Sequence, residues 1–121
     1  MNDYDFELEK ELASGNFKRL DLDKWFKTYQ YNYIYYAIQG CDKVINKEVL
    51  DFIIIYADML LTKSIKTTNC DREEIIFNCE YLLTQAIVVG CKHFEEYKEI
   101  VNCEIDDKLL NDRSIAAEIS N

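Results

Sequence analysis

Residues that could catalyse a reaction or bind a metal are few and scattered in this sequence. Cys91 and His93 form the closest Cys/His pair, and His93 is the single histidine. A structural zinc site needs four ligands at close pairwise spacing, which this chain lacks. We therefore expect no metal ion and interpret His93 as a surface or helix-end residue. The five cysteines, Cys41, Cys70, Cys79, Cys91 and Cys103, are expected to be small apolar side chains of a reduced, cytoplasmic protein.

Carboxylates in apolar surroundings are a second candidate for chemistry. Asp51 and Asp58 are seven residues apart, hence on one face of a helix, and Glu80 lies in a similar setting. Di-metal carboxylate sites in helical bundles also need Glu-x-x-His pairs, and none occurs here. We interpret Asp51 and Asp58 as the solvent-facing stripe of a buried helix. Three isolated glycines make no phosphate-binding loop, so we expect no cofactor and no enzymatic activity.

The acidic excess lies at the two ends of the chain. Residues 1–12 carry a net charge of −4, residues 13–94 are neutral, and residues 95–121 carry −5. This arrangement disfavours nucleic acids and anionic membranes as partners and favours a basic protein. We predict that the partner is bound by acids of the last block: Glu95, Glu96, Glu99, Glu104, Asp106 and Asp107.

Aromatic residues crowd the segment from Trp25 to Tyr36. One helix cannot bury all of them on a single side, and Tyr31 and Tyr35 point away from the face that carries Tyr33. Because tyrosine is enriched at interfaces, we predict that Tyr31 and Tyr35 are partner-binding anchors. The alternative is a large core that contains both.

Hydrophobic spacing of three and four predicts the elements that would position these residues. The chain has no proline, which favours long helices. Gly15 and Asn16 mark the end of a first helix, Asp21 or Asp23 begins a second, and Asn46 caps a third. We expect these helices: 3–13, 21–45, 46–66, 72–90, 91–105 and 107–119. The helix at 72–90 ends at Gly90 or continues through it.

These elements predict one all-α domain over residues 1–121, a compact bundle of about five or six helices around two central apolar helices, 46–66 and 72–90. In general character, and on no motif, the chain resembles immunity proteins that neutralise nuclease toxins. We expect a binding protein that inhibits a basic protein target, with a nuclease toxin first, by blocking its electropositive active site. The alternative is a phage- or virus-encoded helical adaptor that binds through a hydrophobic groove. Association with a second copy stays open.

Overall fold

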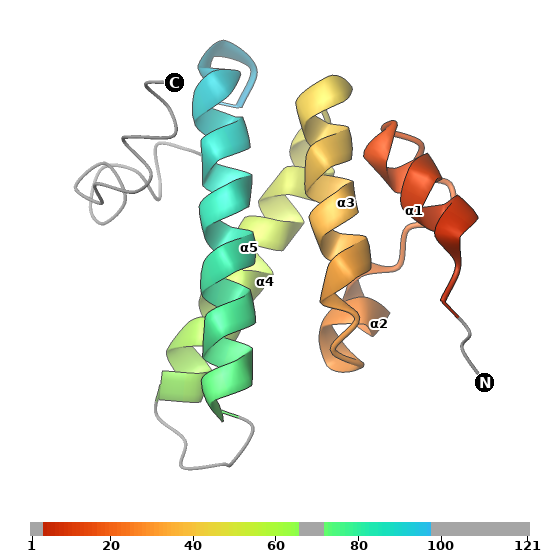
Figure 1. Cartoon of the computed structure of the whole chain (residues 1–121). Coiled ribbons are helices and arrows are strands. Elements are labelled where there is room, and N and C mark those ends of the chain that lie inside the picture. The colour runs from red at the N-terminus through yellow and green to blue at the C-terminus, as the bar shows by residue number, and fades with distance from the viewer. Residues whose placement is uncertain (1–3, 66–71, 98–121) are drawn as a thin grey trace.

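The computed structural model describes residues 4–65 and 72–97, where helices joined by short turns and loops are the regular secondary structure and no strand occurs. This confirms the predicted all-α class. A single further helical turn covers residues 94–97. The helices are α1 (Phe6–Ala13), α2 (Leu22–Lys27), α3 (Tyr31–Lys43), α4 (Lys47–Ile65) and α5 (Arg72–Lys92) (Figure 1).

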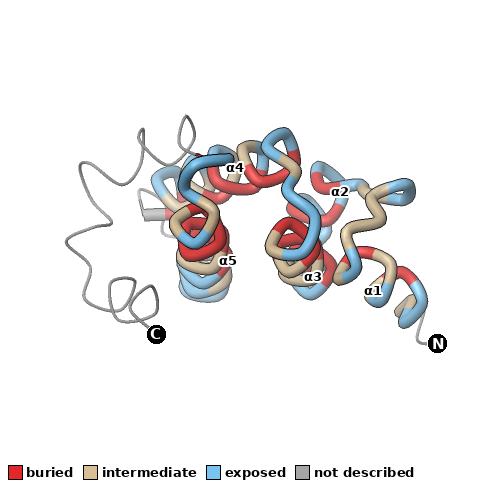
Figure 2. Tube along the Cα trace, turned by 90° about the horizontal axis from the view of Figure 1, so that it is seen from above, coloured by how far each residue is buried: buried red, intermediate tan, exposed pale blue. Residues whose placement is uncertain are grey.

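The helices form two layers. Seen from above, α1, α3 and α5 stand in a row, and α2 and α4 lie behind them (Figure 2). The two most apolar helices, α4 and α5, form the most extensive helix pair, and α3 contacts each of the other four helices. Side chains between the layers are fully buried, including Ile34, Ile38, Leu50, Ile53, Ile54, Leu82 and Ile87. The row α1–α3–α5 therefore has one face on the core and one face open.

Side-chain caps begin three of these helices, as expected from the short polar residues before them. The carboxylate of Asp5 accepts the amide N–H of Leu8 at 3.0 Å, and that of Asp21 accepts the N–H of Lys24 at 3.3 Å. The side-chain oxygen of Asn46 accepts the N–H of Val49 at 3.1 Å. The first helix therefore begins at Phe6, three residues later than the sequence predicted.

The predicted continuous helix over residues 21–45 is wrong. The chain leaves α2 after Lys27, and Tyr29 adopts a left-handed backbone with φ of +58° before α3 begins at Tyr31. The break has a physical reason. It lets Trp25 and Phe26 turn into the core, with the Trp25 ring 5.0 Å from that of Tyr33. A single straight helix would leave part of this aromatic segment in water.

Two glycines allow α1 to pack closely on α3. Gly15 has φ of +89° and ends α1, as predicted. Gly40 lies inside α3, and a Cβ there would stand 2.0 Å from the backbone oxygen of Leu12. The two backbones therefore touch at Gly40, which fixes the position of α1 beside α3. The third glycine, Gly90, is buried within α5, so the helix continues through it to Lys92.

The predicted continuous helix over residues 91–105 is interrupted: α5 ends at Lys92, and His93 forms a turn before residues 94–97. Tyr97 is fully buried, and its hydroxyl donates to the carbonyl of Cys41 at 2.9 Å and accepts the N–H of Asn46 at 2.7 Å. This side chain ties the end of α5 to the α3–α4 turn. The remainder of that prediction, and the predicted helix 107–119, lie outside the described residues.

One helix in the described ranges, α5, is long and apolar enough to cross a membrane by length and composition. In the structure it packs against α4 and α3, and residues 86–90 are buried. Packing of this kind gives the apolar sequence of α5 a role in the core of the bundle.

Candidate functional site

The carboxylates singled out in the sequence do not come together. Asp51 and Asp58 are half-buried along one edge of α4, and Glu80 is exposed on α5. Within residues 4–65 and 72–97, no three His, Cys, Asp or Glu side chains are placed to hold a metal ion. The exposed side chains of α4 include the apolar residues Phe52, Ile55 and Met59, so the expectation of an acidic solvent stripe is only partly met.

The cysteines that the structure describes contribute to the packing of the interior. Cys41 and Cys79 are fully buried, and burial raises the pKa of the Cys41 thiol to about 12 and that of Cys79 to about 11. Burial also raises the pKa of Cys91. Thiols in this state are protonated at neutral pH and are poor nucleophiles.

His93 lies at the end of α5, as predicted, and contacts Asp42 of α3. Its Nε2 is 2.7 Å from one carboxylate oxygen of Asp42, and the Nζ of Lys92 is 3.6 Å from the other. These contacts stand beside the buried hydroxyl of Tyr97 and join α5 to the end of α3. We interpret this group as structural.

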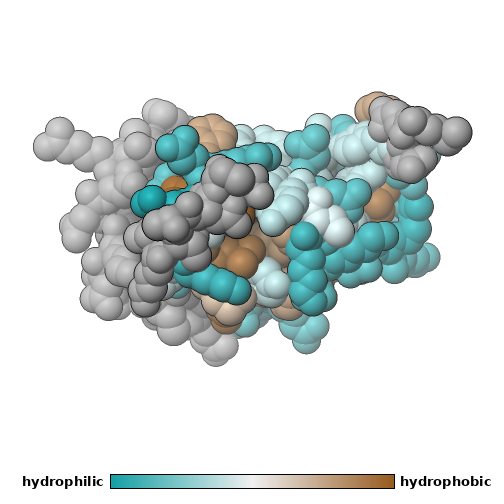
Figure 3. Space-filling view, turned by 90° about the horizontal axis from the view of Figure 1, so that it is seen from below, coloured by the Kyte–Doolittle hydropathy of each residue, from teal (hydrophilic) through white to brown (hydrophobic). Residues whose placement is uncertain are grey.

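Large apolar side chains reach the surface in several places on the described part of the molecule. Figure 3 shows brown side chains between hydrophilic ones on the lower face. Most of the exposed aromatic and aliphatic residues fall into two sets. Phe6, Phe77 and Tyr81 belong to α1 and α5, and Phe52, Ile55 and Met59 belong to α4.

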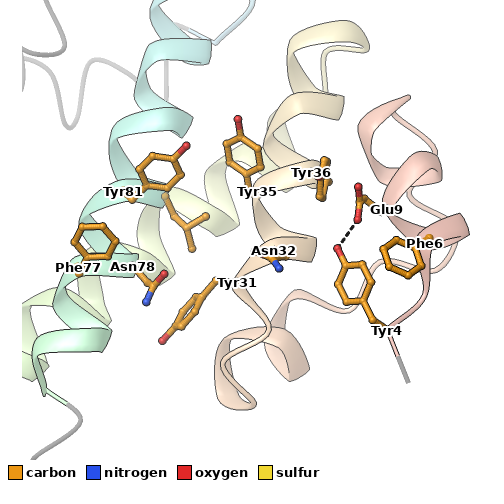
Figure 4. Close-up of a pocket in the computed structure, with 11 residues that line it drawn as sticks. Tyr4, Phe6, Glu9, Tyr31, Asn32, Tyr35, Tyr36, Phe77, Asn78 and Tyr81 are labelled. Carbon is orange, nitrogen blue, oxygen red and sulfur yellow. Dashed lines mark hydrogen bonds between the residues drawn. The ribbon is translucent and has the colours of Figure 1, made fainter. Parts of the chain in front are cut away.

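The first set surrounds a cavity of about 830 Å³ on the open face of the row α1–α3–α5. We call it the aromatic groove (Figure 4). Tyrosine, phenylalanine and asparagine make up most of its wall. Its lining residues are Tyr4, Phe6, Glu9, Tyr31, Asn32, Tyr35, Tyr36, Phe77, Asn78, Tyr81 and Leu82.

Three helices build the groove. In Figure 4, α3 forms the floor, with Tyr31 and Asn32 one helical turn before Tyr35 and Tyr36. The wall from α5 carries Phe77 and Tyr81, and Tyr81 packs beside Tyr35 with ring centroids 5.7 Å apart. Phe77 is 70% exposed, so its ring contacts solvent and does not pack into the core of the bundle. An aromatic ring held in water beside other aromatic rings is a ready contact surface.

The wall from α1 carries the groove's one carboxylate, Glu9. The hydroxyl of Tyr4 donates to Glu9 Oε2 at 2.6 Å, and Tyr36 also forms a hydrogen bond with Glu9. Burial, and then the bond to Glu9, raise the pKa of Tyr4 well above that of an ordinary tyrosine. The bond to Glu9 raises the pKa of Tyr36 as well. Two neutral phenols thus hold an anion in a fixed place on an aromatic wall.

Tyr31 occupies the deep end of the groove. It is only 9% exposed, its hydroxyl has no hydrogen-bond partner in the structure, and burial raises its pKa. A smaller cavity of about 300 Å³ continues from this point and includes Glu74. An unpaired buried hydroxyl is unfavourable, so a ligand group that reaches it gains a hydrogen bond.

The structure brings only part of the predicted partner-binding set together. Tyr31 and Tyr35 both line the groove. Tyr35 is half-buried, but Tyr31 is buried and is not an exposed anchor as predicted. Glu95 and Glu96 are exposed beyond the end of α5 and do not line it. Glu99, Glu104, Asp106 and Asp107 lie outside the described residues.

The sequence-based prediction missed the α1 and α5 walls. The available signal was the position of Phe77 and Tyr81 off the apolar face of the helix at 72–90. Large aromatic residues outside a helix's buried face are a sign of a contact surface.

Comparison of the chain with models of protein families, with curated proteins and with solved structures finds no match.

Proposed function

We propose that this chain is a non-enzymatic binding protein that holds a basic segment of a partner protein in the aromatic groove. The observation that carries the proposal is the groove itself, with exposed rings on the α1 and α5 walls and the fixed carboxylate of Glu9 on α1. Tyrosine-rich concave surfaces bind protein segments well because each ring offers a large contact area with little side-chain entropy to lose.

Charge supports a basic occupant. Glu9 is the single charged side chain among the groove's lining residues, and the adjoining cavity adds Glu74. Lysine and arginine side chains can lie along tyrosine and phenylalanine rings and present their cations to the ring faces and to Glu9. An acidic segment would meet repulsion from the same carboxylates, and from the net charge of −9 on the whole chain.

We further propose that the partner is a nuclease toxin, inhibited when its electropositive surface is covered, and that the complex forms in the cytoplasm. A nuclease must attract phosphate, so its active site is a basic target for an acidic protein. The groove also favours a second candidate, a helical adaptor, because a largely uncharged aromatic floor accommodates an amphipathic helix. The two candidates differ in whether binding blocks catalysis.

The test uses the full chain and a candidate nuclease encoded beside its gene. Binding is measured by calorimetry and inhibition by cleavage of nucleic acid at matched concentrations. We expect Phe77→Ala or Tyr35→Ala to weaken binding about 30-fold, the effect of losing one interface anchor of about 2 kcal/mol. Phe52→Ala, an equally large change on the outer face of α4, is the matched control and should leave affinity unchanged.

Each outcome separates the candidates. Inhibition that Phe77→Ala abolishes supports the inhibitor, whereas tight binding without inhibition supports the adaptor. Binding that is insensitive to Phe77→Ala and Tyr35→Ala would contradict the groove as the binding site.

A further inference from the structure

We infer that the outer face of α4 binds the same face of a second copy of this chain, in an antiparallel, two-fold symmetric pair. The face consists of Glu48, Phe52, Ile55, Met59 and Lys63, which we call the α4 stripe. This surface belongs to the rear layer of the fold and shares no residue with the aromatic groove (Figure 2).

The α4 stripe is apolar in its middle and exposed. Ile55 is 56% exposed, Met59 50% and Phe52 38%, and the spacing of three and four puts them on one side of the helix. Glu48 and Lys63 are exposed at the two ends of the same side. An unpartnered stripe of this kind, in the middle of a long helix, is the usual form of a helix–helix contact.

The stripe is also rigid. Phe52 stacks on Tyr56 with ring centroids 5.4 Å apart, and Tyr56 stacks on the buried Phe26 of α2 at 4.7 Å. Three rings in a row hold Phe52 in place from the core outward. A preordered side chain loses less entropy on association, which favours binding.

The order of residues along the stripe selects a second copy as the occupant. A two-fold axis passing between Ile55 and Tyr56 relates position 48 to position 63 and position 52 to position 59. Two antiparallel copies of α4 would thus pair Glu48 of each chain with Lys63 of the other. The same symmetry places Phe52 against Met59 and brings the two copies of Ile55 together at the centre.

The other candidate occupant in this chain is its own segment 98–121, and charge disfavours it. That segment carries six acidic and three basic residues, and the stripe itself contains Glu48 and is flanked by the acids Asp51 and Asp58. A second copy of α4 instead offers a lysine to each glutamate. Self-association therefore pairs each Glu48 with a lysine, whereas the acidic segment would repel Glu48.

The experiment is sedimentation equilibrium of the full chain over a dilution series. We expect a reversible dimer whose dissociation constant rises about tenfold in Glu48→Lys, because each dimer then has two like-charge pairs in place of two ion pairs. Lys63→Glu should have a similar effect. Combining Glu48→Lys with Lys63→Glu reverses both charges and should restore the affinity of the unchanged chain.

Ile55→Glu should abolish the dimer. The helical circular dichroism signal should stay unchanged, because Ile55 is exposed in the single chain. Phe77→Glu, at a still more exposed position in the groove, is the control and should leave the dimer intact. A chain that is monomeric at every concentration overturns the inference, whether segment 98–121 or a foreign partner covers α4. Failure of the double reversal to restore affinity overturns the antiparallel pairing. Neither result bears on groove binding, since no α4 stripe residue lines the groove.

Discussion

Replacing Gly40 with alanine tests how α1 is positioned, and with it one wall of the aromatic groove. The new Cβ would stand 2.0 Å from the backbone oxygen of Leu12, whereas ordinary van der Waals contact begins near 3.4 Å. The backbone of α1 must therefore retreat by about 1.4 Å. A flexible side chain could rotate away from such a contact, but a helix backbone can only move as a whole.

The magnitude follows from two opposing effects. Overpacking of this kind costs about 3 kcal/mol, the upper end of the usual range, because backbone rather than side chain must move. Alanine in place of glycine inside a helix stabilises the helix by about 1 kcal/mol. We expect Gly40→Ala to lower the free energy of unfolding by about 2 kcal/mol, or the melting temperature by about 8 °C.

The assay is urea unfolding followed by circular dichroism, with Gln39→Ala as the control. Gln39 is the preceding residue of α3 and is half-buried, so its substitution should have a small effect. Because Phe6 and Glu9 lie on α1, Gly40→Ala should also weaken binding at the groove. A Gly40→Ala protein as stable as the unchanged chain would refute the close approach of α1 and α3.

Three other predictions concern stability and association. Tyr97→Phe should lower the free energy of unfolding by about 1–3 kcal/mol, because the part-buried N–H of Asn46 and the buried carbonyl of Cys41 lose their partner. Tyr29→Phe, at an exposed ring, is the control, and equal urea midpoints for both variants would contradict this role. The N–H of Leu8, and then Arg19, lower the pKa of Asp5 below its ordinary 3.8. The ionised carboxylate of Asp5 therefore stabilises the fold above about pH 4, and this contribution is lost as the pH falls through the lowered pKa. Asp5→Asn should flatten the dependence of the urea midpoint on pH in this acid range, and an unchanged slope would count against it. Changing the exposed Glu95 and Glu96 to glutamine should slow association with a basic partner in stopped-flow measurements and reduce its salt dependence, and an unchanged rate at low salt would exclude steering by these acids.

The helices were predictable where local rules determine them. Asn46 caps α4, Gly15 ends α1, and apolar spacing identifies α4 and α5, because capping and periodic burial depend on residues close in sequence. The break at Tyr29 was not predictable in this way. It depends on Trp25 and Phe26 reaching a core built by distant helices, and a tyrosine with a left-handed backbone carries no local signal.

Of the predicted partner-binding residues that the structure describes, only Tyr31 and Tyr35 line the groove. Tyr31 and Tyr35 could be singled out from the crowding of aromatic residues in their helix, although Tyr31 is itself buried in the core. The groove also needs Phe6 from α1 and Phe77 from α5, and these residues meet only through the packing of three helices. Gly40 decides how close α1 comes, and its importance shows only when the backbone of Leu12 is seen beside it.

The aromatic groove is proposed to bind a basic segment of a protein. The most direct measurement is an NMR titration of the ¹⁵N-labelled full chain with a synthetic amphipathic helix rich in lysine, arginine and leucine. Its counterpart with glutamate at the basic positions is the control. We predict saturable shifts at Tyr35, Phe77 and Tyr81 with the basic peptide, their loss in Phe77→Ala, and none with the acidic peptide. Shifts confined to α4, or equal binding of both peptides, would contradict the claim.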